Sequence, residues 1–382
     1  MQNNVLNTCI IYHLNITSKS GEKLELTEVF TKFEIYEDIF THFLSGTLAI
    51  RDTSDMLKNF PIIGGEHVEI AFADSHHISA RFFDFYVDEV VPQIIPSDEL
   101  NKNTLIILKL KSWYWLNSRK LRYSFMFEDT TQGIVSGLMS DVGSFKTVQS
   151  TDSKQMKFVS NFWNIEEILD YICYQNNDTL FFETPLNHNL KTVSSLVSQS
   201  PTQEIFMLKN LEGKAGINTV LQYHFDKYFA VSKMYDSNGF GKTSYQPQME
   251  SYNHKIDFST LDEIYDTYKL MGQNKPFLPA LSTYDNDIDV EYDDLETSIK
   301  RNIILSTLQH YNLIAILNGS FNRSVGDVIS FNLPPFDNTP MNQNFHGNWL
   351  ITQIKHTVTA NFEFKQNVRL FKNAFFNNPK VG

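Results

Sequence analysis

One series of strand-like segments occurs twice in this chain, and it limits the possible folds more than any other feature. Each copy has a half-apolar segment, a polar turn, a glycine, an alternating segment and two further strand-like segments. Aligning Gly65 with Gly326 brings HVEIAF into line with VISFNL, so that the same alternate positions are apolar in both. Alternation with period two is typical of strands with one buried face. Its recurrence over residues 44–113 and 313–372 predicts a duplicated small β-barrel or sandwich.

The later parts of the two copies also correspond. VDEV at residues 87–90 matches ITQI at residues 351–354, and the final strands would cover residues 104–113 and 362–372. The distance from the glycine to these segments differs between the copies by the length of a short loop. We expect the two copies to differ mainly in their loops, because loops tolerate insertions that strands do not.

Composition narrows the class of protein. The 382 residues suffice for several domains with cores that need no covalent links. A net charge of −12 argues against a dedicated nucleic-acid-binding protein, because such proteins use Lys and Arg to neutralise phosphates. Cys9 and Cys173 are too few for a disulfide framework or a four-cysteine metal site. No apolar run reaches the ~18 residues of a membrane-spanning helix, so we expect a soluble protein without a classical export signal.

Two regions outside the repeat have simple patterns. Alternating residues at 4–16 and 24–36 predict strands ahead of the first copy, with a turn at 18–22 between them. Residues 192–202 (TVSSLVSQSPT) are mostly polar and predict a linker.

Three helices are predicted between the two copies. Apolar residues at helical spacing predict a helix over residues 131–142 that ends at Gly143. Asn164 and Glu167 form a variant capping box. The helix that it starts would carry apolar residues on one face, namely Ile165, Ile168, Leu169 and Ile172. A third helix is predicted over residues 295–311.

Together these elements predict a β-rich α+β protein with two tube-like β-barrel domains and a middle α+β domain. The expected ranges are 1–113 for the first barrel, 114–202 with 246–311 for the middle domain, 203–245 with 312–377 for the second barrel, and 378–382 for a C-terminal tail. In this arrangement residues 246–311 are an insertion in the second barrel, and they belong to the middle domain.

The C-terminal third carries the clearest family resemblance. A predicted helix over residues 299–309 is followed by LIAILNGSFNRSVGDVISFNL, GNWLITQIKHTVT and FKQNVRLFKNAF. This succession resembles the baseplate central hub proteins of contractile-tailed bacteriophages, the tail-tube-to-spike adaptor family that is related to the hub part of VgrG-type proteins. The family has the same order of an extended strand, an Asn- or Thr-rich turn, a Val-Gly or Pro-Gly step into a strand, and two final strands. At the level of pattern the resemblance covers nearly the whole chain.

The resemblance implies a homotrimer in which each subunit contributes two barrels, giving a ring of pseudo-sixfold symmetry. Such a ring would adapt a hexameric tail tube to a trimeric central spike and leave a channel for DNA. The implied partners are the tail tube or tube-initiator protein, the central spike protein and baseplate wedge proteins. The implied location is the tail baseplate of the virion, after synthesis in the host cytoplasm. An acidic channel would let DNA pass without sticking, although the acidic balance equally favours solubility.

An acidic segment at residues 285–296 has the spacing of a calcium loop but lacks part of the pattern. Its carboxylates fall at alternate loop positions, which suits a hard cation. Val290 occupies the position where the sharp turn calls for glycine, and Pro276 and Pro279 argue against the incoming helix. We favour a solvated loop in which Asp293 or Asp294 caps the following helix.

Other candidate motifs are also incomplete. GFGKT at residues 239–243 ends like a phosphate-binding loop, but Asp236 stands where the first glycine belongs. His76 and His77 have no third ligand at zinc spacing. Adjacent carboxylates occur at 166–167 and 88–89, and glycosidases use two carboxyls facing each other across a cleft. The sequence therefore predicts no catalytic residue, no cofactor and no metal site.

The favoured function is that of a structural, non-enzymatic hub. One alternative is the hub of a type VI-like secretion spike, which would continue into a spike-like repeat that is not found before Gly382. A second is a tail-associated hydrolase of cell wall or polysaccharide, which would need a cleft of paired carboxylates. A third is a host-receptor adhesin, which would present exposed aromatic platforms.

Overall fold

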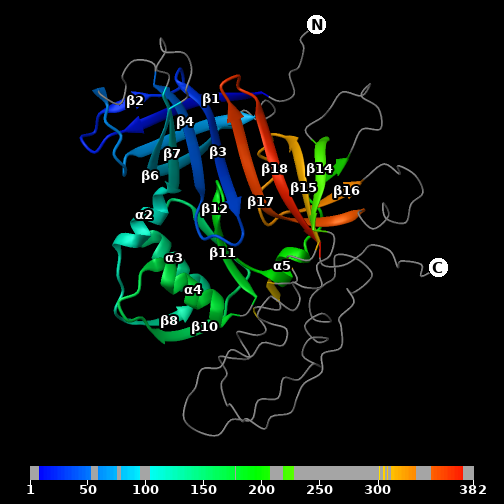
Figure 1. Ribbon diagram of the computed structural model, residues 1–382. Helices are drawn as coiled ribbons and strands as arrows, with labels where there is room; N and C mark the ends of the chain where they lie inside the picture. Colours follow the sequence, from blue (N-terminus) through cyan, green and yellow to red (C-terminus); the bar gives the residue numbers. More distant parts are fainter. Residues whose placement is uncertain are drawn as a thin grey trace, which may run out of the picture.

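A long, mostly antiparallel sheet curls through the computed structural model, and a helical unit lies below its first half (Figure 1). The strands of the sheet come from both ends of the chain, whereas the helical unit comes from the middle. No helix among the described residues has the length and apolar character needed to cross a membrane. The described residues are 8–52, 59–74, 79–94, 104–176, 178–206, 218–227, 301, 304, 305, 308, 311–332 and 346–372.

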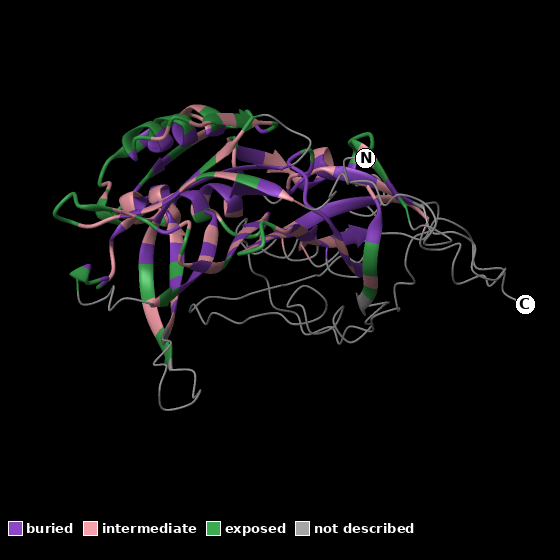
Figure 2. Cartoon of the chain, turned by 90° about the horizontal axis from the view of Figure 1, so that it is seen from above, coloured by how far each residue is buried: buried purple, intermediate pink, exposed green. Residues whose placement is uncertain are grey.

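The first strand group occupies residues 9–112 and is antiparallel throughout, in the order β3-β4-β7-β6-β5-β1-β2. Alternate side chains are buried, as the sequence predicts, and the alternation is visible along the strands in Figure 2. The buried face is rich in phenylalanine, including Phe33, Phe72 and Phe85. Its strands are β1 Cys9–Thr17, β2 Lys23–Glu25, β3 Phe30–Asp38, β4 Ser45–Asp52, β5 His67–Asp74, β6 Arg81–Ile94 and β7 Thr104–Ser112.

The second strand group has the order β14-β15-β18-β17-β16-β13. All its pairs are antiparallel except β13 with β16, which are parallel. Two of its strands, β13 and β14, precede residue 228, and the other four follow residue 310. The strands are β13 Gln203–Phe206, β14 Val220–Lys227, β15 Tyr311–Asn318, β16 Val328–Asn332, β17 Gly347–Thr359 and β18 Phe364–Lys372.

The two groups share a run of pairings. The neighbours β3-β4-β7-β6-β5 in the first group match β14-β15-β18-β17-β16 in the second. They also share an irregularity, because β6 bulges against β7 between Val87 and Glu89, and β17 bulges against β18 between Ile351 and Gln353. Beyond this run the groups differ, since β1 is antiparallel to β5 whereas β13 is parallel to β16.

The two glycines aligned in the sequence occupy the same local position in these groups. Gly65 N donates to Val87 O at 2.7 Å, and Gly326 N donates to Ile351 O at 2.8 Å. Both glycines have positive φ, +84° and +87°, which glycine adopts without the strain that a Cβ would cause. The alignment therefore identified equivalent turns.

The helical unit (residues 113–197) joins the two groups. Its helices are α2 Trp113–Lys120, α3 Thr131–Asp141, α4 Ile165–Gln175 and α5 Val193–Val197. Its strands are β8 Met126–Thr130, β9 Thr147–Ser150, β10 Gln155–Val159, β11 Thr179–Glu183 and β12 Asn187–Thr192. A buried carboxylate anchors the unit to the first group, because Glu183 accepts Leu44 N at 3.0 Å and Lys146 Nζ at 2.7 Å.

The predictions for this unit are confirmed for two helices. α3 ends at the predicted place, and Gly143 has φ +75°. At α4, Asn164 N donates to the Glu167 carboxylate at 2.6 Å and Glu167 N donates to Asn164 Oδ1 at 2.9 Å, which completes the capping box. The four apolar residues predicted for one face of α4 are fully buried.

Three other predictions were wrong in part. Residues 24–36 form two strands separated by a turn, because Leu26 turns inward and its carbonyl accepts Val29 N at 3.1 Å. Residues 192–202 are not simply a linker, since α5 buries apolar residues that the polar composition concealed: Val193, Leu196 and Val197. In the predicted 295–311 helix, residues 301, 304 and 305 are helical, but Tyr311 already begins β15.

Two glycine substitutions should have opposite effects on the free energy of unfolding. A Cβ at Gly46 would lie 2.8 Å from the backbone oxygen of Glu34 in the neighbouring strand, so Gly46→Ala should destabilise by about 1–3 kcal/mol. Gly137 lies on the exposed side of α3 with no atom within 4 Å of such a Cβ. Gly137→Ala should stabilise by about 0.5–1 kcal/mol, because alanine favours helix. Urea unfolding measures both, and a shift in the same direction for the two variants would contradict this packing.

Candidate functional site

The two strand groups join edge to edge, and this junction, where buried polar groups of both meet, is the candidate functional site. β17 is long enough to pair with two strands along one edge. Its residues 347–350 pair with β16, and its residues 353–359 pair with β3. Where the partner of β17 changes from β16 to β3, Ile39 N donates to Thr352 O at 3.1 Å. The hydrogen-bonded sheet therefore continues from one group into the other.

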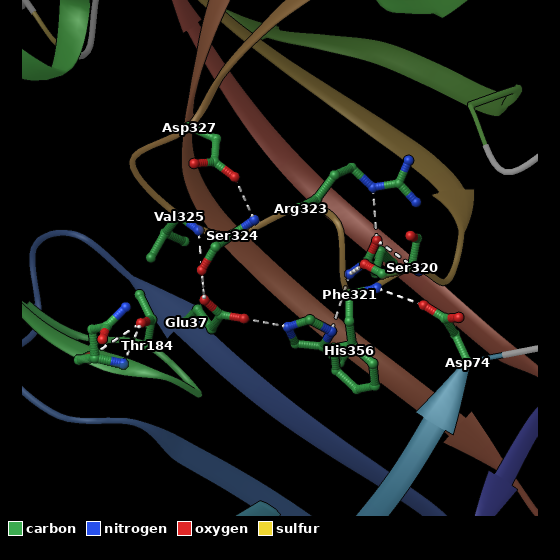
Figure 3. Close-up of polar contacts among 12 residues, drawn as sticks. Glu37, Asp74, Thr184, Ser320, Phe321, Arg323, Ser324, Val325, Asp327 and His356 are labelled. Carbon is green, nitrogen blue, oxygen red and sulfur yellow. Dashed lines mark hydrogen bonds and ion pairs between the residues drawn. The ribbon is translucent and has the colours of Figure 1, made fainter. Parts of the chain in front are cut away.

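A buried histidine and carboxylate lie on the core side of the junction (Figure 3). His356 Nε2 is 2.6 Å from Glu37 Oε1, and both residues are at most 1% exposed. The Gln366 amide Nε2 is 3.2 Å from His356 Nδ1 and can only donate, so Nε2 of the histidine carries the proton that Glu37 accepts. The pair therefore connects β3 of the first group to β17 of the second.

The loop between β15 and β16 adds further contacts to the first group. Ser324 Oγ donates to Glu37 Oε2 at 2.9 Å. Phe321 N donates to Asp74 Oδ2, at the end of β5, at 2.7 Å. Two carboxylates of the first group thus hold a loop of the second, and both are about 1% exposed.

Arg323 supplies positive charge to this cluster. Its side chain is 1% exposed, and its Nε donates to Gln366 Oε1 at 2.9 Å while the guanidinium also donates to the Asn318 carbonyl. Burial lowers the pKa of Arg323 to about 10, and the nearby Asp74 opposes that shift. The guanidinium remains charged at neutral pH, which places a buried cation close to a buried carboxylate.

Asp327 closes the loop at the start of β16. Its carboxylate accepts Ser324 N at 2.9 Å. Burial raises the pKa of Asp327 to about 6, the Ser324 hydrogen bond opposes the shift, and the negative charge of Glu37 adds to it. The proton on Asp327 therefore depends on the same cluster that joins the two groups.

The sequence pattern did not identify the polar residues of the junction, although their positions in the strands are unusual. Glu37, His356 and Gln366 each occupy the apolar phase of an alternating strand. Polar residues in that phase are buried, and buried polar groups need partners. Strand patterns alone do not say which strands become neighbours, so the sequence could not pair these three residues.

The carboxylate pairs from the sequence do not face a shared cleft. Glu166 and Glu167 lie in the first turn of α4, where Glu166 pairs with Arg119 and Glu167 completes the helix cap. Glu89 pairs with Lys109 at 2.6 Å on the exposed face of β6. These carboxylates are engaged in ion pairs and caps, which is not the geometry of a glycosidase.

One arrangement in the helical unit has the residue types of a nucleophile and its base. Ser144 Oγ lies 2.7 Å from His188 Nε2. His188 is fully buried, burial lowers its pKa to about 4, and its Nδ1 has no hydrogen-bond partner among the described residues. A catalytic histidine needs an acceptor on that nitrogen to hold the ring and stabilise its cation. We interpret the pair as a structural hydrogen bond.

The remaining sequence candidates cannot be placed. The acidic segment 285–296, the GFGKT segment 239–243, and His76 and His77 lie outside the described residues. Within the described residues, no group of three His, Cys, Asp or Glu side chains is arranged to hold a metal ion. The two cysteines are buried and unpaired, and burial raises the pKa of each to about 12.

Comparison with solved structures shows the fold. The chain is similar to a 43 kDa tail protein of prophage MuSo2 from Shewanella oneidensis, with 11% identity and a TM-score of 0.57 over 94% of this chain and 98% of that chain. It is also similar to a tail protein from Neisseria meningitidis MC58, with 8% identity and a TM-score of 0.56 over 97% of this chain and 98% of that chain. No family model and no curated protein matches the sequence. The chain thus has the fold of phage tail proteins, as its sequence resemblance predicted.

Removing the Glu37 carboxylate should destabilise the protein strongly. Glu37→Ala leaves His356 Nε2 and Ser324 Oγ buried without their acceptor, and each buried donor left unsatisfied costs about 1–3 kcal/mol. A matched control is Glu128→Ala, which breaks an exposed pair with Lys157 and should cost under about 1 kcal/mol. Urea unfolding compares the two variants, and equal costs would show that the junction does not depend on Glu37.

Asp327 should make stability depend on pH. Its folded-state pKa of about 6 lies above the ordinary value of 3.8, so between these values the folded protein binds a proton that the unfolded chain has released. Stability contributed by this group is therefore lost as pH rises from about 4 to about 6. Asp327→Asn removes that loss, and its free energy of unfolding relative to the natural protein should rise from pH 4 to pH 7 by up to about 3 kcal/mol. A difference that is constant across this range would contradict the assignment.

Proposed function

We propose that this chain, which has the fold of phage tail proteins, is a structural hub subunit of a tail baseplate, and that three copies form a ring between the tail tube and the central spike. The observation that carries the proposal is the correspondence between the two strand groups. They match in strand order, in the bulge at the equivalent place and in the glycine turn that precedes it. We interpret them as a duplicated tube-like unit.

Such a duplication suits a joint between assemblies of different symmetry. A chain with two matching units presents nearly the same surface twice, so three chains present it six times. Closed rings are the usual form of homo-oligomers, and a threefold ring of this kind would match a hexameric tube on one side and a trimeric spike on the other. The proposed partners are therefore the tail tube or tube-initiator protein, the central spike protein and baseplate wedge proteins.

The charge of the sheet bears on the proposed DNA channel. On β3, β4, β7, β17 and β18, the side chains that point away from the core include more basic than acidic residues. The basic residues are Lys32, Arg51, Lys109, Lys111, Lys355, Lys365 and Arg369, against Glu34 and Asp38. If this face lines the channel, the channel would attract the DNA backbone weakly, whereas the net charge of −12 suggests repulsion.

The alternatives receive less support from the described residues. A hydrolase would need carboxylates across a cleft, and the pairs described above serve caps and ion pairs. The hub of a type VI-like secretion spike would share the ring proposed here and differ in the spike that it carries. The nature of that partner, not the fold of this chain, would distinguish the two.

The mass of the purified protein in solution tests the proposed ring. Three copies of a 44.3 kDa chain should give about 133 kDa by light scattering, alone or together with the spike protein of the same tail. Negative-stain images of that species should show a ring with six similar lobes. A monomer at all concentrations, with and without the spike, would overturn the proposal and make assays on cell-wall and polysaccharide substrates the next step.

A further inference from the structure

The first strand group contains the counterpart of the junction edge, and no described strand pairs with it. After its bulge at Thr352, β17 pairs with β18 on one side and with β3 on the other. After the equivalent bulge at Asp88, β6 pairs with β7. On the side of β5, the ladder of β6 ends at Tyr86, and the described residues provide no strand beyond it. Residues 89–94 of β6 therefore offer the edge that β17 uses at the internal junction.

The turn beside this edge differs from its counterpart in the second group by one exposed apolar residue, which suits a surface that another chain covers. In the second group, Ser324 N donates to Asp327, and Ser324 Oγ donates to Glu37 across the junction. In the first group, Ile63 N donates to Glu66 Oε1 at 2.9 Å, so Ile63 is the counterpart of Ser324. The Ile63 side chain is 76% exposed, although it stands where its counterpart is in contact with a neighbouring strand.

β14 is the counterpart of the strand that fills this place internally. β3 bulges against β4 between Phe30 and Lys32, and β14 bulges against β15 between Val220 and Gln222. β14 is also the terminal strand of the long sheet in the described residues, on the opposite side of the molecule from β6 (Figure 1). Each chain thus has the open edge of β6 on one side and, on the opposite side, the terminal strand β14, which corresponds to β3.

We propose that β14 of one copy pairs antiparallel with residues 89–94 of β6 in the next copy, repeating the contact of β3 with β17. The proposal rests on the ring proposed above and names the surface that would close it. The bulges that match set the register, since Gln93 of β6 corresponds to Thr357 of β17, and His224 of β14 corresponds to Glu34 of β3. A second bulge in β14, between Phe225 and Lys227, has no counterpart in β3 and lies beyond this pair. Because Thr357 is opposite Glu34, Gln93 of one copy lies opposite His224 of the next.

Backbone hydrogen bonding and side-chain contact would both contribute to this interface. Pro92 is the counterpart of His356, so the ladder between copies lacks one N–H donor that the internal ladder has. Proline occurs on edge strands where its nitrogen faces solvent, so this one position of the proposed ladder would stay without a backbone hydrogen bond. Ile63 would contribute apolar contact where the internal junction uses the hydroxyl of Ser324. The contact joins different surfaces of two copies, so it can close a ring when repeated.

A disulfide between the two edges tests the register. The bond from Ile39 N to Thr352 O makes 352 a hydrogen-bonded position, so Thr357 and Glu34 form a non-hydrogen-bonded pair. Such pairs have Cα atoms about 4.5 Å apart, within the range of a disulfide. The double variant Gln93→Cys and His224→Cys should therefore cross-link neighbouring copies on mild oxidation and give a covalent trimer on a non-reducing gel. The natural cysteines should stay reduced, because both are buried with pKa values near 12.

Two matched pairs of cysteines serve as controls. Thr357→Cys with Glu34→Cys should form a disulfide within one chain and leave its gel mobility near that of a monomer. Gln93→Cys with Gln222→Cys is out of register by two residues on the same exposed face, and should cross-link at least several-fold less. Equal cross-linking by the registered and shifted pairs would overturn the proposed register.

Light scattering of the same samples separates this proposal from the proposed function. A trimer that does not cross-link through Gln93 and His224 would overturn the edge contact and leave the ring standing. A cross-linked series that extends beyond three chains would support the edge contact and overturn the trimer. A monomer, with the spike present, would overturn both.

A surface substitution gives a second measurement that does not depend on oxidation. Ile63→Asp should weaken the association of copies at least tenfold, because it places a charge in the proposed interface. Phe145→Asp is the matched control, since Phe145 is 99% exposed in the helical unit and lies outside the proposed contact. Unchanged association of the Ile63 variant would count against the interface.

Discussion

The carboxylate of Glu37 is buried where the two strand groups meet, and the relative position of the groups depends on satisfying it. An uncompensated buried charge costs several kcal/mol, so the residues that face Glu37 have little freedom to move away. Those residues, His356 and Ser324, belong to the second group, whereas Glu37 belongs to the first. The backbone ladder between β3 and β17 joins the groups, and the buried pair fixes how they join.

The two strand groups carry different side chains at equivalent turns, and the difference has a physical pattern. At the internal junction the turn before the glycine carries Ser324, which bonds a buried carboxylate. At the counterpart the turn carries Ile63, which is exposed. An internal contact forms once during folding and can be held by a buried polar network. A contact between separate copies must first leave both surfaces soluble, and a small apolar contact beside an open strand edge satisfies that condition.

Net charge and local charge give different expectations for this protein. The chain as a whole is acidic, but the solvent face of its central strands has more basic than acidic residues. Some of these basic residues are balanced locally, since Lys32 and Lys355 lie 3.1 and 3.4 Å from the Glu34 carboxylate. Electrostatic effects on a passing polymer depend on the charges that face it, because surface charges are screened over about 8–10 Å in physiological salt. Composition alone therefore could not describe the proposed channel.

The sequence by itself determined most strands of the two groups, the two matching turns, the end of α3 and the start of α4. These features depend on neighbours along the chain: alternation at Gly65 and Gly326, the Asn164–Glu167 cap, and Gly143 after α3. It failed at α5, where burial by distant residues outweighs a polar local composition, and at Leu26, where an inward turn divides one predicted strand. Only the tertiary structure decided that β17 would pair with β3 and bring His356 to Glu37. Strand edges are chemically alike, so the choice of partner is made by the packing of the whole sheet and by buried groups that find one another only after the chain has folded.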